Sequence, residues 1–198
     1  MRRLIAVAAC FALIFTMRGN AAMPPEAFQM LPRPKEVVLT GGAGLSYGGL
    51  RGLVLVDCRR PVLPPLLDFL PLLEESGRGV LTLRLAADAE LPASTEGYAL
   101  TVREGRAEIA SRGQAGLFYG CRTLAQLLED ARDTGTAIPA LAIRDWPMLE
   151  YRAVHIDTKH HLDTLRYNYD LIDRLAAIKI NAIIWEFEDK LATGCVRW

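Results

Sequence analysis

The stretch RDWPMLEYRAVHIDTKHH at residues 144–161, followed by INAIIWEFEDK at residues 180–190, decides the fold expected for this chain. Residues 152–156 are typical of a short strand, and residues 165–180 repeat apolar side chains at helical spacing. Residues 180–187 are apolar almost throughout until Glu186, as in a parallel strand covered on both faces. Strand, helix and strand together predict a right-handed βαβ crossover, whose helix either Asp163 or Thr164 can cap.

The loop after the first of these strands separates two folds that use such a unit. A dinucleotide-binding fold needs a glycine-rich turn there, and TKHHLD at residues 158–163 contains no glycine. An α/β barrel instead places polar side chains at its strand ends. Such residues follow both predicted strands: Asp157, Lys159, His160 and His161 after the first, Glu188 and Asp189 after the second. We therefore expect residues 146–198 to be the start of a (β/α)8 TIM barrel, which one βαβ unit cannot close.

Residues 31–145 have the pattern of a separate α+β domain. The string GYALTVREGRAEIAS at residues 97–111 predicts a β-hairpin that turns at Glu104 and Gly105. A helix is expected over residues 116–130, with its apolar stripe covering one face of a sheet. The strands expected in this domain span residues 36–40, 53–56, 80–85, 98–102, 107–110 and 138–143.

The amino terminus, MRRLIAVAACFALIFTMRGNAA, is typical of a secretory signal peptide spanning residues 1–22. Its apolar run, residues 4–17, is too short to cross a bilayer as a helix. An uncleaved anchor and a lipid attached at Cys10 are weaker interpretations, and we discount the lipid because only six apolar residues precede that cysteine. We expect export to the periplasm or the medium, with no stable membrane span after signal cleavage.

Charge and cysteine content exclude two classes of partner. Removing residues 1–22 takes away three arginines and no acid, so the 23 basic and 23 acidic side chains of the chain become 20 and 23. This slightly acidic balance is no basis for binding nucleic acid. Cys58, Cys121 and Cys195 then remain, with spacings that match no metal motif. We interpret Cys58 and Cys121 as core residues.

Several strings, in this order, resemble landmarks of glycoside hydrolase family 20, the β-N-acetylhexosaminidases: LPRPKEV, EGYALTV, AGLFYGCRTLAQLL, IRDWPMLEYRAVHIDTKHH and INAIIWEFEDK. The resemblance spans residues 31–190. It implies a zincin-like α+β accessory domain followed by the first βαβ unit of a catalytic TIM barrel, here truncated. The ending WEFEDK is most similar to the hexosaminidase D branch of the family.

The resemblance implies retaining hydrolysis of terminal β-linked N-acetylglucosamine or N-acetylgalactosamine, in which the substrate's own acetamido oxygen attacks the anomeric carbon. The family's catalytic Asp-Glu pair has no counterpart here and is expected beyond Trp198, so this fragment alone should be inactive. Two substrate-binding residues carry over by position: Asp189, which would accept hydrogen bonds from hydroxyls of the terminal sugar, and Lys159, which replaces a forked arginine. No cofactor is implied.

Other polar residues near the strand ends have simpler interpretations. Asp157 is interpreted as a structural partner near Arg152. Three histidines within seven residues, His155, His160 and His161, lack the spacing of a helical zinc site, so no metal is expected. Trp185 is interpreted as core, with sugar stacking as the alternative. Glu186 and Glu188 alternate on one strand face, where solvated, salt-bridged and sugar-binding roles are all open.

Two alternatives to an enzyme remain at this point. The chain could be a non-catalytic secreted module whose α+β domain binds carbohydrate or protein. It could also be a truncated or frameshifted product, since the tail ATGCVRW at residues 192–198 departs from the family pattern. Coding sequence beyond Trp198 that supplies further βα units and an Asp-Glu strand end would distinguish the enzyme from both.

Overall fold

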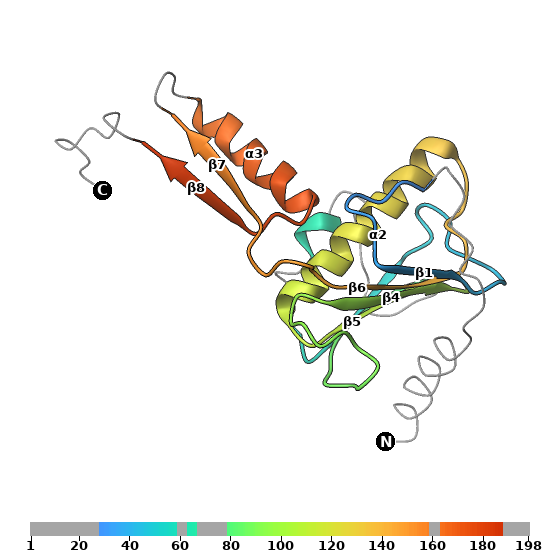
Figure 1. Cartoon of the computed structure of the whole chain (residues 1–198). Helices are drawn as coiled ribbons and strands as arrows, with labels where there is room; N and C mark the ends of the chain where they lie inside the picture. Colours follow the sequence, from blue (N-terminus) through green and yellow to red (C-terminus); the bar gives the residue numbers. More distant parts are fainter. Residues whose placement is uncertain (1–27, 59–62, 67–78, 159–162, 188–198) are drawn as a thin grey trace. The chain divides into compact units, whose positions relative to one another are not determined.

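The computed structural model describes residues 28–58, 63–66, 79–158 and 163–187. The chain divides into two compact units, Met1–Pro147 and Met148–Trp198 (Figure 1). The signal-peptide segment, Cys10, Cys195 and the predicted site residues Lys159 and Asp189 lie outside the described residues. No helix among the described residues is both long and apolar enough to cross a membrane.

A six-stranded mixed sheet forms the first unit, in the order β1-β6-β4-β5-β3-β2. Strand β3 pairs in parallel with β2 and β5, and the remaining pairs are antiparallel. Every strand predicted from the sequence is present: β1 (Glu36–Leu39), β2 (Gly52–Val56), β3 (Val80–Leu85), β4 (Tyr98–Arg103), β5 (Arg106–Ser111) and β6 (Leu141–Asp145). A 3-10 turn, η2 (Pro64–Leu66), accompanies them.

The last strand of this sheet begins later than predicted. A strand was expected over residues 138–143, but β6 spans Leu141–Asp145. Ile138 forms only an isolated antiparallel bridge with Leu45. Pro139 follows it, and a proline has no N–H to donate to a ladder, which explains why regular pairing starts two residues later.

The predicted hairpin is confirmed. Leu100 of β4 lies opposite Ile109 of β5, and both are fully buried. Glu104 and Gly105 both have positive φ, 49° and 72°. Two consecutive left-handed residues are the signature of a type I′ turn, whose twist matches that of the strands it joins.

Helix α2 (Gln114–Thr134) packs on one face of the sheet, against β3, β4 and β5 (Figure 1). It is longer than the predicted 116–130, because it starts after the extended Gly113 and stops at Gly135, which has φ 68°. Its apolar stripe is buried as expected: Leu117, Cys121, Leu124, Leu127 and Leu128. Cys121 lies in the core, and Cys58 is partly buried against it.

A buried polar cluster ties α2 to the end of the sheet. The Tyr98 hydroxyl lies 2.6 Å from Thr123 Oγ1 and donates to Asp145 Oδ2 at 3.2 Å. Asp145 Oδ1 accepts the backbone N–H of Lys35 at 3.2 Å. Burial raises the pKa of the Tyr98 hydroxyl well above its ordinary value, and the neighbouring Asp145 carboxylate adds to the shift. The Asp145 carboxylate on β6 therefore binds Tyr98 of β4 and the residue that precedes β1, and Tyr98 extends the cluster to Thr123 of α2.

The second unit is the predicted βαβ unit. Strand β7 (Ala153–Asp157) pairs in parallel with β8 (Ala182–Glu186), and α3 (Leu165–Ala177) connects them. Thr164, rather than Asp163, caps α3: its Oγ1 accepts from the Tyr167 N–H at 3.2 Å. The helix ends at Ala177 instead of residue 180, because Lys179 adopts the left-handed conformation with φ 64°.

Burial in the second unit differs from the prediction of a strand covered on both faces. Along β7 the side chains of Val154 and Ile156 are half-buried, and those of the alternate residues Ala153, His155 and Asp157 are exposed. Ile184, on β8, is 48% exposed. Because α3 lies along one side of this two-stranded sheet (Figure 1), one face is covered and the other is open within the described residues.

Candidate functional site at the ends of β7 and β8

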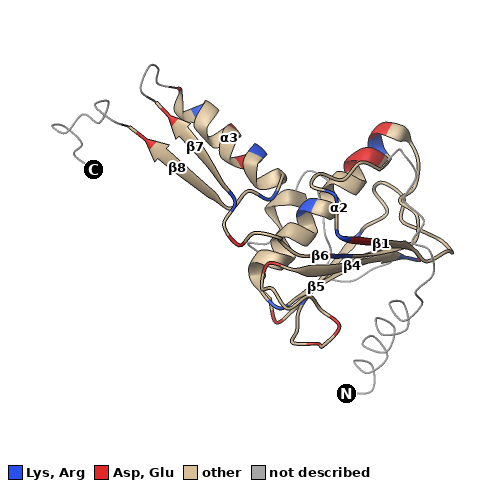
Figure 2. Cartoon of the chain, viewed as in Figure 1, with Lys and Arg blue, Asp and Glu red and all other residues tan. Residues whose placement is uncertain are grey.

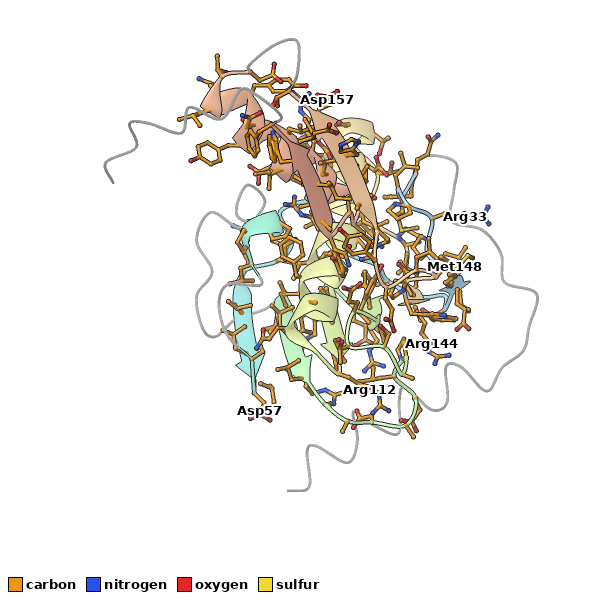
Figure 3. All side chains as sticks on the ribbon, turned by 60° about the vertical axis from the view of Figure 1, so that its left-hand side comes forward. Arg33, Asp57, Arg112, Arg144, Met148 and Asp157 are labelled. Carbon is orange, nitrogen blue, oxygen red and sulfur yellow. The ribbon has the colours of Figure 1, made fainter. Side chains whose placement is uncertain are left out.

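The carboxyl ends of the two parallel strands place a pair of acids side by side. Asp157 is the last residue of β7 and lies in register with Glu186, the last residue of β8. Acidic residues mark both strand tips in Figure 2, and Figure 3 labels Asp157 at the tip of β7. In α/β folds, functional side chains gather at this edge of a sheet.

An ion pair crosses the open face of this sheet. His155 Nε2 lies 2.7 Å from Glu186 Oε2, with the two side chains 55% and 40% exposed. His155 precedes Asp157 by two residues, so both side chains leave β7 on the same face. Glu186 is therefore salt-bridged when His155 is protonated, and a salt bridge was one of the roles left open for it.

The backbone at the end of β8 is held by the residue that follows β7. Thr158 donates to the Glu186 carbonyl twice, from its backbone N–H at 3.0 Å and from Oγ1 at 2.9 Å. The Thr158 side chain is buried. The carbonyl and the carboxylate of Glu186 are therefore both fixed from the neighbouring strand.

Arg152 lies at the other end of β7, where it binds the neighbouring loops. Its guanidinium donates to the carbonyls of Leu149 and Lys179, each at 2.7 Å. Five residues of strand, about 16 Å, separate it from Asp157. The two residues therefore lie at opposite ends of β7, and the structural role predicted for Asp157 stays a prediction.

The two predicted substrate-binding residues, Lys159 and Asp189, fall outside the described residues, as do His160, His161 and Glu188. Their roles stay predictions. Lys159 follows Thr158 directly, and Asp189 comes three residues after Glu186. Across the described ranges there is no group of three or more histidine, cysteine or acidic residues that could hold a metal ion.

Trp185 lies on the half-buried face of β8. Its ring stacks with that of Phe187, at 6.3 Å between centroids and 12° between planes. This contact with a residue just after β8 fits the packing role predicted for Trp185, while sugar stacking stays an untested alternative.

Sequence reasoning missed the contact between His155 and Glu186. The histidine was grouped with His160 and His161 as a possible metal cluster, because the three are close in sequence. The available signal was period-two alternation, which puts His155 and Asp157 on one face of β7 and Ile184 and Glu186 on one face of β8. What could not be read was the register that brings the two faces together.

Comparison with known proteins finds a family similarity within the first unit. Residues 70–146 match the family model described as glycosyl hydrolase family 20, domain 2. This stretch is therefore similar to domain 2 of glycosyl hydrolase family 20. The predicted resemblance to this family is thereby confirmed.

Curated family 20 relatives include a β-N-acetylhexosaminidase from Cellulomonas fimi, 36% identical over 110 residues. That match covers 56% of this chain and 22% of the relative. A β-hexosaminidase from Akkermansia muciniphila is 33% identical over 103 residues, covering 52% of this chain and 21% of the relative. The chain thus spans about a fifth of the length of the curated relatives it matches.

Solved family 20 structures resemble most of the chain. The β-N-acetylhexosaminidase of Streptomyces coelicolor superposes with a TM-score of 0.66 at 29% identity, covering 83% of this chain and 35% of that one. The enzyme of Streptomyces plicatus gives 0.67 at 27% identity, covering 85% and 36%. The observed mixed sheet and its helix fit an accessory domain of this family.

Proposed function

We propose that this chain is the amino-terminal part of an exported β-N-acetylhexosaminidase that removes terminal β-linked N-acetylglucosamine or N-acetylgalactosamine. The observation that carries the proposal is the match of residues 70–146 to family 20, domain 2. Relatives named β-N-acetylhexosaminidase and β-hexosaminidase share about a third of the aligned residues with the chain, which supports the same reaction class.

The second unit is proposed to begin the catalytic barrel. Two parallel strands joined by a helix are the repeating element of a (β/α)8 barrel. Acidic residues at the carboxyl ends of both strands support this assignment, because that end carries the active site in barrel enzymes. The covered face would then lie toward the helical ring, and the open face with His155 and Glu186 toward the barrel interior.

In the proposed reaction the substrate supplies its own nucleophile, the acetamido oxygen. Asp189 accepts hydrogen bonds from hydroxyls of the terminal sugar, and Lys159 donates one. The Asp-Glu pair that orients the acetamido group and protonates the leaving oxygen is assigned to sequence after Trp198, because this chain contains no Asp-Glu dipeptide.

Acetamido dependence tests the proposed reaction. The protein translated from the complete reading frame containing this chain is assayed with 4-nitrophenyl N-acetyl-β-glucosaminide, N-acetyl-β-galactosaminide and, as a matched control, β-glucoside. Without the acetamido group the nucleophile is absent. We therefore expect 4-nitrophenol to be released from both N-acetyl substrates, and none above the buffer blank from the glucoside. Equal turnover of the glucoside would overturn the mechanism, and no turnover of either N-acetyl substrate would overturn the function.

Export is tested separately. The arginines at positions 2 and 3, the apolar run of residues 4–17 and the small residues at 21 and 22 support cleavage before Met23. Amino-terminal sequencing of protein recovered from the periplasm or medium should start at Met23. A sequence starting at Met1 would contradict the signal peptide.

A further inference from the structure

Glu186 makes more contacts with neighbouring residues than is usual for an exposed acidic residue. Its carbonyl accepts two hydrogen bonds from Thr158, and its carboxylate binds His155. All three contacts come from residues 155–158: those from Thr158 fix the backbone of Glu186, and the one from His155 fixes its side chain. Exposed ion pairs contribute little to stability, at most about 1 kcal/mol, so stability alone does not explain this anchoring.

The anchored carboxylate still has acceptor capacity. His155 occupies Oε2, and Oε1 has no hydrogen-bond partner among the residues that the structure describes. A carboxylate fixed through one oxygen presents the other in a defined direction, which is what recognition of a sugar hydroxyl requires. Glu186 lies on the open face, at the strand end from which the chain continues to Asp189.

We infer that Glu186 is a further acceptor for a hydroxyl of the N-acetylhexosamine substrate and that His155 is its positioning residue. This inference rests on the proposed function. Oε1 of Glu186 accepts the hydroxyl proton in a hydrogen bond, and His155 Nε2 donates to Oε2 and limits the rotation of the carboxylate. Binding of the sugar is then weakened when either residue is removed, and the two losses are not independent.

The test is a double-mutant cycle in the protein translated from the complete reading frame, assayed with 4-nitrophenyl N-acetyl-β-glucosaminide. A charged hydrogen bond to substrate corresponds to about a tenfold effect, so Glu186→Ala should raise KM about tenfold. His155→Ala should raise KM several-fold with little change in kcat. His155→Gln, whose amide can donate in place of Nε2, should recover most of the loss.

Coupling separates positioning from packing. In the Glu186→Ala background, His155→Ala should have no further effect on KM, because the carboxylate it holds is gone. Ile184→Val is the matched control, since it alters the same face of β8 without touching the ion pair, and it should leave KM unchanged. Melting temperatures of all variants monitor folding, and Glu186→Gln replaces Glu186→Ala if the latter does not fold.

Each remaining outcome contradicts the inference. Additive effects of the two substitutions, or losses in kcat that follow falling melting temperature, would show a structural role for His155. Unchanged KM in Glu186→Ala with an active wild type would overturn the inference alone. An inactive wild type would overturn the proposed function as well.

Discussion

At the scale of single residues, the chain shows two uses of a carboxylate. Asp145 is buried and shares its oxygens between the Tyr98 hydroxyl and the Lys35 N–H, which fastens the end of the sheet beneath α2. Glu186 is partly exposed and held by His155 through one oxygen. Both oxygens of Asp145 are engaged within the fold, whereas Glu186 can still accept a hydrogen bond from a ligand.

Tyr98 should make the first unit sensitive to high pH. Its folded-state pKa is raised by burial and by Asp145, so the folded state resists ionisation of the hydroxyl. The resulting stability is fully present below the unfolded pKa, about 10, and is lost as the pH rises toward the folded value. Denaturant unfolding should therefore show the free energy of unfolding falling above pH 10.

Tyr98→Phe isolates this effect. The variant should be less stable at pH 7 by about 1–2 kcal/mol, because Thr123 and Asp145 lose their shared partner. It should also lose less stability than the wild type above pH 10. Tyr47→Phe, at a tyrosine that is 45% exposed, is the control and should follow the wild-type profile. Parallel profiles for wild type and Tyr98→Phe would contradict the interpretation.

Asp189 and Lys159 give a residue-scale prediction about the substrate site. In the complete protein, Asp189→Ala should lower kcat/KM for the chromogenic N-acetylglucosaminide by about 2–4 kcal/mol, the scale of losing charged hydrogen bonds in a desolvated site. Lys159→Ala should cost less, because a lysine lacks the fork that binds two hydroxyls. Unchanged kinetics for a folded Asp189→Ala variant would remove Asp189 from the site.

At the scale of elements, the distance between α2 and the sheet depends on a missing side chain. A Cβ at Gly120 would overlap Ile109 and come within 3.2 Å of the Tyr98 ring. Both neighbours are fully buried, so neither has room to move. Glycine destabilises the interior of a helix relative to alanine, but at this position it allows the helix and the sheet to pack closely.

Gly120→Ala should therefore destabilise the first unit by about 1–3 kcal/mol through overpacking, outweighing the gain in helix propensity of about 1 kcal/mol. Ala115→Gly, at an exposed position of the same helix, is the control in the reverse direction. It should lower stability by up to about 1 kcal/mol through propensity alone. A more stable Gly120→Ala variant in thermal or urea unfolding would show that α2 is less tightly packed than the structure indicates.

At the scale of the whole molecule, the two units differ in how completely they bury apolar surface. The first has a core of fully buried side chains that includes Leu83, Leu100 and Leu124. Helix α3 in the second has no buried residue, and Leu165 and Ile184 are 73% and 48% exposed. A two-stranded sheet with one helix is marginal by itself, so we expect the first unit to withstand proteolysis longer than the second.

The 198-residue chain as it stands should show no glycosidase turnover. The proposed mechanism needs an Asp-Glu pair, and this chain contains no Asp-Glu dipeptide. The parallel strands β7 and β8 by themselves cannot close a barrel. The purified chain is incubated with 4-nitrophenyl N-acetyl-β-glucosaminide beside a buffer blank and a heat-treated sample. Heat-labile release that co-purifies with the chain would show that the catalytic residues have been misplaced.

Among the described residues, local pattern by itself determined the strands, the helices α2 and α3, the hairpin turn and the parallel βαβ unit. Alternation, helical spacing and turn residues act over a few neighbouring positions. The backbone conformation was required to locate the ends of the helices at Thr134 and Ala177 and the late start of β6. Only tertiary structure decided that Asp145 meets Tyr98 of β4 and Lys35 next to β1, and that His155 meets Glu186 across two strands. Those contacts depend on strand order and register, which are set by packing between residues far apart in the sequence.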